Sequence, residues 1–128
     1  PFYWDLNDKT RAFAKRFGER MEGQMPTTDH AGVYSATLAY LRSAKAANTI
    51  EGDKVVAEMR KATIDDDLFG PTTVRVDGRA VHSMYVFKVK TPAESKNKYD
   101  LYKLVSEIPA DQAFRPLEAG GCPLVKAK

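Results

Sequence analysis

The run from Thr28 to Thr49, TDHAGVYSATLAYLRSAKAANT, constrains the fold more than any other part of the sequence. Thr28 or Asp29 is placed to cap a helix that Asn48 and Thr49 end. Apolar side chains at helical spacing form two neighbouring stripes, and the small residues between them let other backbone approach closely. We therefore expect this helix to be the most buried one of the chain.

A second amphipathic helix precedes this run. Asn7 or Asp8 is its predicted cap, and Gly23 with Pro26 ends it. Basic and acidic residues occupy most of its surface, so it buries a single stripe. That stripe consists of apolar residues at four-residue intervals, Phe13, Phe17 and Met21.

A third, shorter helix is predicted to start near Asp53, with an inward-facing set formed by Val55, Val56 and Met59. From Asp65 the pattern changes. The acidic triplet at 65–67 and the Gly70-Pro71 step indicate a loop. The order of elements up to this point is helix, helix, helix.

The second half of the sequence is typical of strands. A β-branched run at 72–76 is followed by Asp77-Gly78, which predicts a two-residue hairpin turn with positive φ angles. The return strand covers roughly 81–90, and a polar loop leads to a final alternating segment at 99–108. The tail at 109–128 is irregular in pattern.

Length and charge limit the possible functions. The chain has 128 residues, of which 43% are apolar, and this is enough for one domain with a core. Its net charge of +3 arises from 20 basic and 17 acidic residues that are interspersed, so no clustered basic face indicates nucleic acid as a partner. No apolar run is long enough to insert into a membrane.

The residues that carry enzyme chemistry are sparse. His30 and His82 lie far apart and outside any metal-binding motif, and Cys122 lacks the basic context that activates a thiol. Consecutive carboxylates at 65–67 point in different directions, unlike the spaced ligands of a calcium loop. No glycine-rich phosphate loop is present in the sequence. The sequence therefore predicts no catalytic residues, metal or cofactor.

The order of these segments resembles the carboxyl-terminal portion of type I periplasmic solute-binding proteins, the branched-chain amino acid receptor family of ABC transporters. The likeness runs from near Tyr3 to about Val89 and extends more weakly into the tail. It includes YWDLND and TRAFAKRF, the step VYSA at 33–36, and the order Gly70-Pro71 to Gly78. No single motif is diagnostic, so the joint order and spacing carry the resemblance.

This resemblance implies an α/β fold, namely part of a two-lobed binding protein with three helices followed by a β-hairpin and a further strand. Residues of about 5–70 would belong to the first lobe, and about 71–128 would form a strand-rich return to the second lobe and the tail. Ligand in this fold lies between the lobes, which close over it. The implied function is periplasmic capture of an amino acid or a small carboxylic acid, aromatic ones included, for the membrane permease of an ABC importer.

The same resemblance implies a set of ligand-binding residues. Asp29 and His30 fall at the start of the central helix, where the relative carries an aromatic pocket residue that is absent here. His30 is either a ligand donor or a helix cap, and Tyr34 lies either in the pocket or in the core. Tyr3 and Trp4 fall at a crossover between lobes, where they either stack on an aromatic ligand or pack the hinge.

A chain that corresponds to the last third of such a receptor lacks the strands that cover its helices. We expect its apolar stripes to be exposed, the isolated chain to be a homo-oligomer, and its own ligand affinity to be negligible. The start at Pro1 without methionine is interpreted as a processed or excised piece with its signal peptide removed, and a partner of Cys122 would lie outside it. Two rival readings are a sensory domain of the same fold and a self-contained α+β interaction module.

Overall fold

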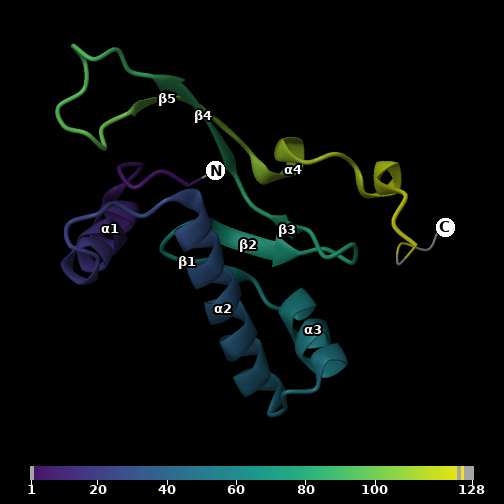
Figure 1. Ribbon diagram of the computed structural model, residues 1–128. Helices are drawn as coiled ribbons and strands as arrows, with labels where there is room; N and C mark the ends of the chain where they lie inside the picture. The colour runs from purple at the N-terminus through teal and green to yellow at the C-terminus, as the bar shows by residue number, and fades with distance from the viewer. Residues whose placement is uncertain (1, 124, 126–128) are drawn as a thin grey trace.

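The computed structural model describes residues 2–123 and 125 and shows an α/β chain of helices followed by short strands (Figure 1). The α-helices are α1 Asp8–Arg20, α2 Thr28–Ala47, α3 Gly52–Lys61 and the short α4 Ala110–Ala113. The strands are β1 Ile64–Asp66, β2 Gly70–Val74, β3 Ala80–Val81, β4 Met84–Val89 and β5 Tyr102–Ile108. A 3-10 turn, η1 Leu117–Gly120, follows α4 in the tail, where the sequence predicts irregular structure. The expected order of three helices, a hairpin and a further strand is confirmed.

Helix α1 begins at a reciprocal cap. The side chain of Asn7 accepts the N–H of Thr10, and the hydroxyl of Thr10 accepts the N–H of Asn7, each at 3.0 Å. The cap is therefore Asn7, one of the two predicted candidates. The helix ends before Gly23, whose positive φ of 77° lets its N–H reach the carbonyl of Gly18 at 2.9 Å.

Helix α2 differs from its prediction in two respects. Its cap is Thr27, one residue earlier than predicted, because Thr27 has extended backbone and donates its N–H to Nδ1 of His30 at 3.1 Å. Asn48 ends the helix in the left-handed conformation, as predicted. The expectation that α2 is the most buried helix is wrong: three of its 20 residues are buried, Ala31, Ala39 and Ser43, against three of 13 in α1, because the described residues leave most of its wide apolar arc uncovered.

Helix α3 packs on α2 and on β2. Val55 is fully buried at this contact. Val56 is exposed, in contrast to the prediction, because it lies one position further around the helix. Within the part of the chain that the structure describes, no helix is long and apolar enough to cross a membrane.

Strand β1 occupies the segment that the sequence analysis interprets as an acidic loop. It pairs antiparallel with β2, with Ile64 opposite Thr72 and Asp66 opposite Gly70. The buried carboxylate of Asp66 accepts the N–H groups of Leu68 and Phe69 at 2.8 Å each and the hydroxyl of Ser35. These donors stabilise the carboxylate in its buried position, so a strand can contain this acidic residue. Because the residue is polar, the apolar pattern of the sequence does not reveal the strand.

The hairpin of β2 and β3 has a longer turn than predicted. Thr73 pairs with Val81, and the N–H of Gly78 donates to the carbonyl of Arg75 at 2.9 Å. Only Gly78 has a positive φ, of 80°, so the prediction of two such residues is wrong. A three-residue loop with glycine in the left-handed position accounts for this geometry. Arg75 bonds to Asp77 at 2.7 Å and lowers the pKa of that carboxyl.

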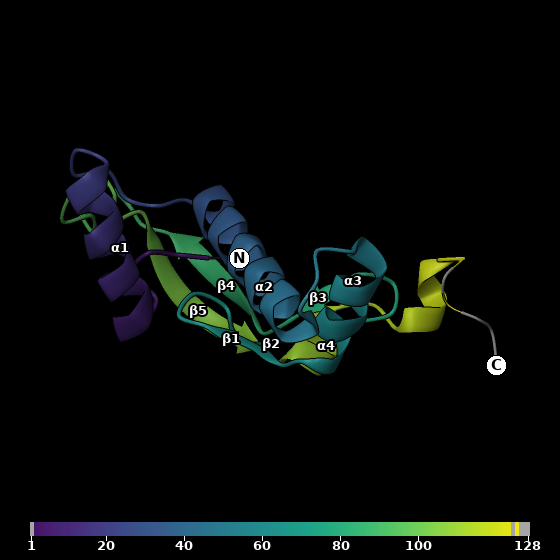
Figure 2. The same ribbon diagram turned by 90° about the horizontal axis from the view of Figure 1, so that it is seen from below.

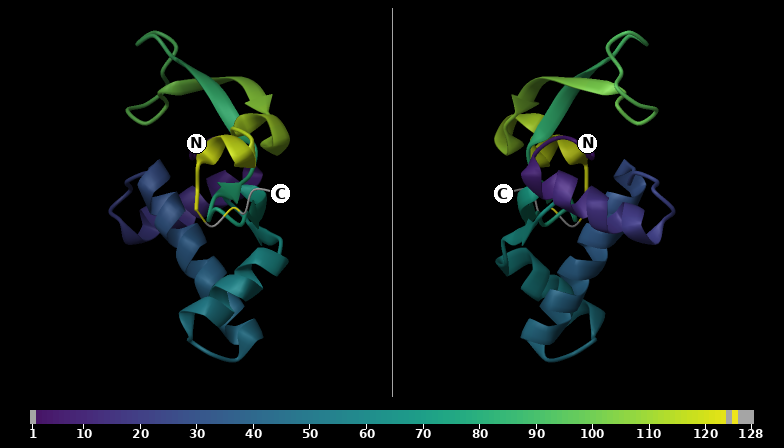
Figure 3. Two further views of the ribbon diagram at one scale, coloured as in Figure 1. Left: turned by 90° about the vertical axis from the view of Figure 1, so that its right-hand side faces the viewer. Right: turned by 90° about the vertical axis from the view of Figure 1, so that its left-hand side faces the viewer.

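The predicted return strand is interrupted at His82 and Ser83, so the chain forms two sheets. One has the order β1-β2-β3, and the other is the antiparallel pair β4-β5 with an irregularity between Val86 and Phe87. We call this pair the β4–β5 ribbon. It extends away from α2 and α3 (Figures 1 and 3), and the last described residues lie at the opposite end of the molecule from α1 (Figure 2).

Two neighbouring residues at the start of the chain belong to two different clusters. Phe2 lies in the buried cluster with Phe13, Ala31 and Leu68. Tyr3 points to the other side of the extended chain and packs on the β4–β5 ribbon. Large apolar side chains are exposed on α2 and on the ribbon, which confirms the expected uncovered stripes: Val33, Tyr34, Tyr40, Leu41, Val86, Val89, Leu104 and Val105.

Candidate functional site

A groove of about 520 Å³ lies between the second half of α1 and the first turns of α2. The turn at residues 21–27 reverses the chain, which brings the end of one helix beside the start of the next. Three of the five predicted ligand-binding residues line this groove together: Asp29, His30 and Tyr34. The remaining lining residues were not predicted as a site and are Phe13, Arg16, Phe17, Arg20 and Val33.

The floor of the groove is aromatic. The ring centroids of Phe13 and Tyr34 are 5.0 Å apart, and those of Phe13 and Phe17 are 6.2 Å apart. The ring centroids of His30 and Phe17 are 4.8 Å apart in an edge-to-face arrangement, while Nδ1 of His30 accepts the N–H of Thr27. His30 thus caps α2, which is one of the two roles considered from the sequence, and its ring also lines the groove.

The rim of the groove is polar. Arg16 and Arg20 follow one another on the same side of α1, and Asp29 lies in the first turn of α2. The guanidinium of Arg16 is 6.0 Å from the centre of the Phe13 ring, which is a cation–π distance. Floor and rim together form a surface for a small molecule that has an apolar body and a charged group.

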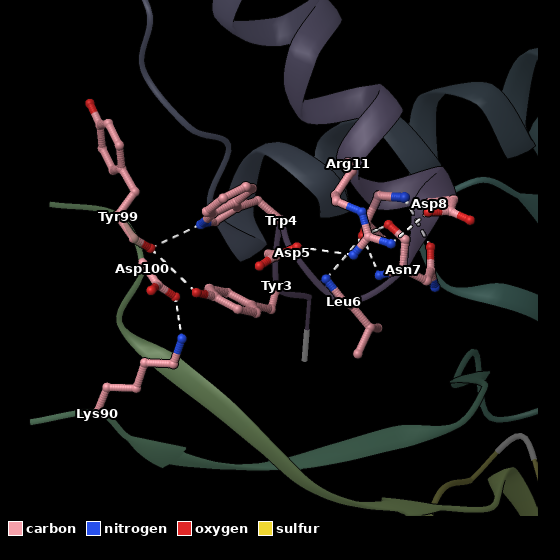
Figure 4. A network of polar contacts seen from close by, with 11 residues as sticks. Tyr3, Trp4, Asp5, Leu6, Asn7, Asp8, Arg11, Lys90, Tyr99 and Asp100 are labelled. Atoms are coloured by element: carbon pink, nitrogen blue, oxygen red, sulfur yellow. Dashed lines mark hydrogen bonds and ion pairs between the residues drawn. The ribbon is translucent and has the colours of Figure 1, made fainter. Parts of the chain in front are cut away.

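The other two predicted residues lie outside the groove: Tyr3 packs on the β4–β5 ribbon, whereas Trp4 packs against the buried helical cluster and reaches the loop that joins β4 to β5 (Figure 4). Trp4 Nε1–H donates to the carbonyl of Tyr99 at 2.9 Å. The hydroxyl of Tyr3 lies 3.4 Å from the same carbonyl and accepts the N–H of Tyr102 at 3.4 Å. Tyr3 is only 7% exposed, and this burial raises the pKa of its hydroxyl.

An ion pair between Lys90 and Asp100 lies next to the contact of Tyr3 and Trp4 with Tyr99. Lys90 Nζ is 2.5 Å from Asp100 Oδ1, and Asp100 Oδ2 accepts the N–H of Lys96 at 3.0 Å. The hydrogen bond from Lys90 is the main cause that lowers the pKa of Asp100, and the same bond raises the pKa of Lys90. We call Tyr3, Trp4, Tyr99, Lys90 and Asp100 the aromatic clamp, because they fix the start of the chain to the end of the ribbon.

The groove residues that sequence reasoning missed have a visible signal. Phe13 with Phe17 and Arg16 with Arg20 are each separated by four positions, so both pairs lie on defined sides of α1. The spacing of these residues does not predict which side of α1 faces α2. Among residues 2–123 and 125, no group of three or more histidine, cysteine or acidic side chains is arranged to hold a metal ion.

Comparison with known proteins identifies the relatives of this fold. The family model described as periplasmic binding protein matches residues 1–98. A periplasmic binding protein from Burkholderia mallei is 38% identical, with a TM-score of 0.90 over 97% of this chain and 32% of its own. A branched-chain amino acid ABC transporter periplasmic ligand-binding protein from Burkholderia xenovorans is 41% identical, with a TM-score of 0.90 over 96% of this chain.

The relationship extends to a more distant structure. An ABC-type branched-chain amino acid transporter protein from Rhodopseudomonas palustris is 26% identical over 89% of this chain, with a TM-score of 0.69. No curated protein matches the chain. The chain spans about a third of the length of the solved relatives, 32% and 33% of the two Burkholderia proteins, so its fold is a partial one. With this match over most of its residues, the chain belongs to the periplasmic binding protein family.

Proposed function

We propose that this chain supplies part of the substrate-binding component of an ABC importer in the periplasm, where it captures an amino acid or a small carboxylic acid for a membrane permease. The observation that carries the proposal is the match of the periplasmic binding protein family over residues 1–98, within which the predicted residues Asp29, His30 and Tyr34 converge on the groove between α1 and α2. A concave, largely aromatic surface with a few charged groups is suited to binding.

The proposal assigns roles to the two groups of residues. Asp29, His30 and Tyr34 contact the ligand, whereas Tyr3 and Trp4 pack the hinge. The burial of Tyr3 and the bond from Trp4 to Tyr99 support the hinge role. The sequence analysis divides the lobes at about residue 70, with about 5–70 in one lobe and about 71–128 in the return to the other. Because β2 and β3 form one sheet with β1 across that position, we propose instead that the division falls at the interruption at residues 82–83, between the two sheets.

The test uses a joined protein, in which this chain replaces the matching third of the Burkholderia xenovorans relative. Isothermal titration calorimetry against single amino acids and small aromatic acids is expected to show binding of one or a few of them. Circular dichroism and gel filtration establish beforehand that the joined protein is folded. A folded joined protein that binds no member of either class would contradict the proposal.

A matched pair of variants locates the binding site. Tyr34 and Tyr40 lie on the same helix with similar exposure, 39% and 42%, but only Tyr34 lines the groove. We expect Tyr34→Ala to weaken binding by about tenfold, since aromatic contacts contribute roughly 1 kcal/mol beyond their buried area. Tyr40→Ala is expected to leave the affinity unchanged. Equal losses in both variants would place the ligand elsewhere.

A further inference from the structure

The net charge of the chain is concentrated at one end of the β4–β5 ribbon. Residues 88–104 contain five lysines and two acidic residues, and their net charge of +3 equals that of the whole chain. Of the 20 basic and 17 acidic residues of the chain, 15 of each lie outside this segment. The segment comprises the end of β4, the joining loop and the start of β5, and it projects from the molecule (Figures 1 and 3).

Four of these five lysines are exposed, and none of the four has a carboxylate within ion-pair distance in the described part of the chain. The two acidic groups of the segment have other partners. Asp100 pairs with Lys90, and Glu94 Oε2 accepts the N–H and the hydroxyl of Thr91 at 2.8 and 2.9 Å. We call the four exposed lysines the lysine tip: Lys88, Lys96, Lys98 and Lys103.

Two lysines of the tip stand directly opposite each other. Lys88 pairs with Lys103 across the two strands. Side chains in such positions have Cβ atoms about 5 Å apart, and like charges there repel each other. The two lysines lie on the face of the ribbon away from Tyr3, because their neighbours Phe87 and Tyr102 contact its ring. Folding therefore brings two cations together without an ion pair among the described residues.

The charge of the lysine tip distinguishes it from the apolar faces of the chain. Burial of an ammonium group without a partner costs free energy, so unpaired lysines stay in contact with solvent. We therefore expect the lysine tip to remain at the surface of the complete receptor. The apolar stripe of α2 is instead a face that further polypeptide is expected to cover.

The composition of the tip favours a membrane surface over a protein as its partner. Residues 88–104 contain no arginine, whereas protein interfaces are enriched in arginine and depleted in lysine. Lysine is a compact charge on a flexible stem and lacks the planar fork by which arginine recognises a fixed carboxylate. Anionic lipids attract clustered lysines without such a fork, at about fivefold in affinity for each lysine.

We propose that the lysine tip is a membrane-contact surface, which binds the anionic phospholipid headgroups of a bilayer and orients the β4–β5 ribbon toward them. Since the rest of the chain is neutral in sum, attraction to an anionic surface acts on this end of the chain. The contact is electrostatic and peripheral. This inference goes beyond the function proposed above and does not depend on which solute is captured.

The experiment measures cosedimentation of the joined protein with vesicles in the absence of solute. One kind of vesicle contains phosphatidylcholine alone, and the other contains phosphatidylcholine and phosphatidylglycerol in equal amounts. We expect binding to the anionic vesicles only, with loss of binding at high salt, because the Debye length falls to about 3 Å at 1 M. No binding to the anionic vesicles, equal binding to both kinds, or binding that salt does not weaken would overturn the inference.

Matched substitutions assign the binding to the tip. Lys88→Gln/Lys103→Gln is expected to weaken binding to anionic vesicles by about 25-fold, about fivefold for each charge. Lys45→Gln/Lys54→Gln removes the same charge from exposed positions on α2 and α3, from which the ribbon extends away, and is expected to change binding by less than about twofold. Equal losses in the two double variants would show that net charge alone acts, which contradicts the inference.

A stability measurement separates membrane contact from a structural role. Because Lys88 and Lys103 repel each other, the variant Lys88→Gln/Lys103→Gln is expected to keep or raise its Tm while it loses vesicle binding. A lower Tm without loss of vesicle binding would give these lysines a structural role and overturn the inference. Lys96→Gln, in the loop, tests the tip without changing the strands and is expected to weaken binding by about fivefold.

The remaining outcomes separate lipid from protein and this inference from the proposed function. Binding of polyglutamate, without binding of anionic vesicles, would assign the tip to an acidic protein and overturn the inference. Solute affinity, measured by calorimetry, is expected to be unchanged in the lysine variants, so failure of vesicle binding leaves the proposed function standing. If the joined protein does not fold, the 128-residue chain and its variants replace it in the same vesicle assay.

Discussion

The helical part of this molecule and its β4–β5 ribbon are held in place by different kinds of contact. In the helical part, apolar side chains bury one another, and the central cluster consists of Phe2, Phe13, Ala31 and Leu68. The ribbon is held by the aromatic clamp, in which hydrogen bonds and an ion pair accompany the packed rings. Burial has no preferred direction, whereas a hydrogen bond weakens steeply when its angle changes.

Because of this difference, the stability of the chain and the orientation of the ribbon depend on different contacts. A two-stranded ribbon is marginally stable by itself, so β4 and β5 depend on what they are attached to. The attachment joins distant parts of the sequence: Tyr3 and Tyr99 are 96 positions apart. The helical part thus determines whether the chain is folded, and a small number of directional bonds determine where the ribbon points.

The largest expected effect concerns assembly. Because apolar side chains are exposed on both parts, we expect the isolated chain to form a dimer or larger oligomer, as measured by light scattering at tens of micromolar. Leu41→Lys on α2 and Val105→Lys on the ribbon are each expected to reduce this association, since the two side chains are 58% and 61% exposed. A monodisperse monomer of the unsubstituted chain would contradict this prediction.

Removal of one ring from the helical part is expected to have the next largest effect. Phe13 is buried between Phe2, Phe17 and Tyr34, so Phe13→Ala leaves a cavity and is expected to lower the free energy of unfolding by about 3–5 kcal/mol. Urea unfolding followed by far-ultraviolet circular dichroism measures it. Val33→Ala, at an exposed position on α2, is the control and is expected to change the value by less than about 0.5 kcal/mol.

The clamp is tested by Tyr3→Ala. The ring of Tyr3 packs on Phe87 and Tyr102, and its loss is expected to cost about 3 kcal/mol in the unfolding of the ribbon. Fluorescence of Trp4, the single tryptophan of the chain, reports on this region. Tyr3→Phe retains the ring and removes only the hydroxyl, with an expected cost of about 1 kcal/mol. Equal effects of the two variants would show that packing contributes nothing to the clamp.

The smallest expected effect is the pH dependence of the ribbon. Since the pKa of Asp100 is lowered in the folded chain, the stability from its ionised form is present above its unfolded pKa of about 3.9 and is lost as the pH falls through its folded pKa. Lys90 has a raised pKa, so its contribution is lost only as the pH rises above about 10.4. An acid titration followed by Trp4 fluorescence is expected to flatten in Asp100→Asn. An unchanged acid transition in this variant would exclude Asp100 as its cause.

Local signals in the sequence were enough to predict the helices and the hairpin. Caps such as Asn7 and Asn48 and the left-handed Gly78 act through neighbouring backbone, so short windows contain the needed information. Strand β1 was missed because Asp66 is satisfied by donors that include Ser35, which lies 31 positions away. The groove was predicted in part, from α2 alone, because periodicity along α1 does not reveal which of its sides meets α2.

The alternation of Phe2 and Tyr3 restricts how the two parts move relative to one another. Their side chains are anchored on opposite sides of one extended segment, in the helical cluster and in the aromatic clamp. Consecutive Cα atoms are separated by a fixed distance of about 3.8 Å, so the two side chains cannot move apart along the chain. Torsion about the bonds between these two residues remains available. This coupling therefore disfavours translation of the ribbon relative to the helical part and favours rotation. Rotation of one part against another is the displacement that opens and closes a two-lobed binding protein.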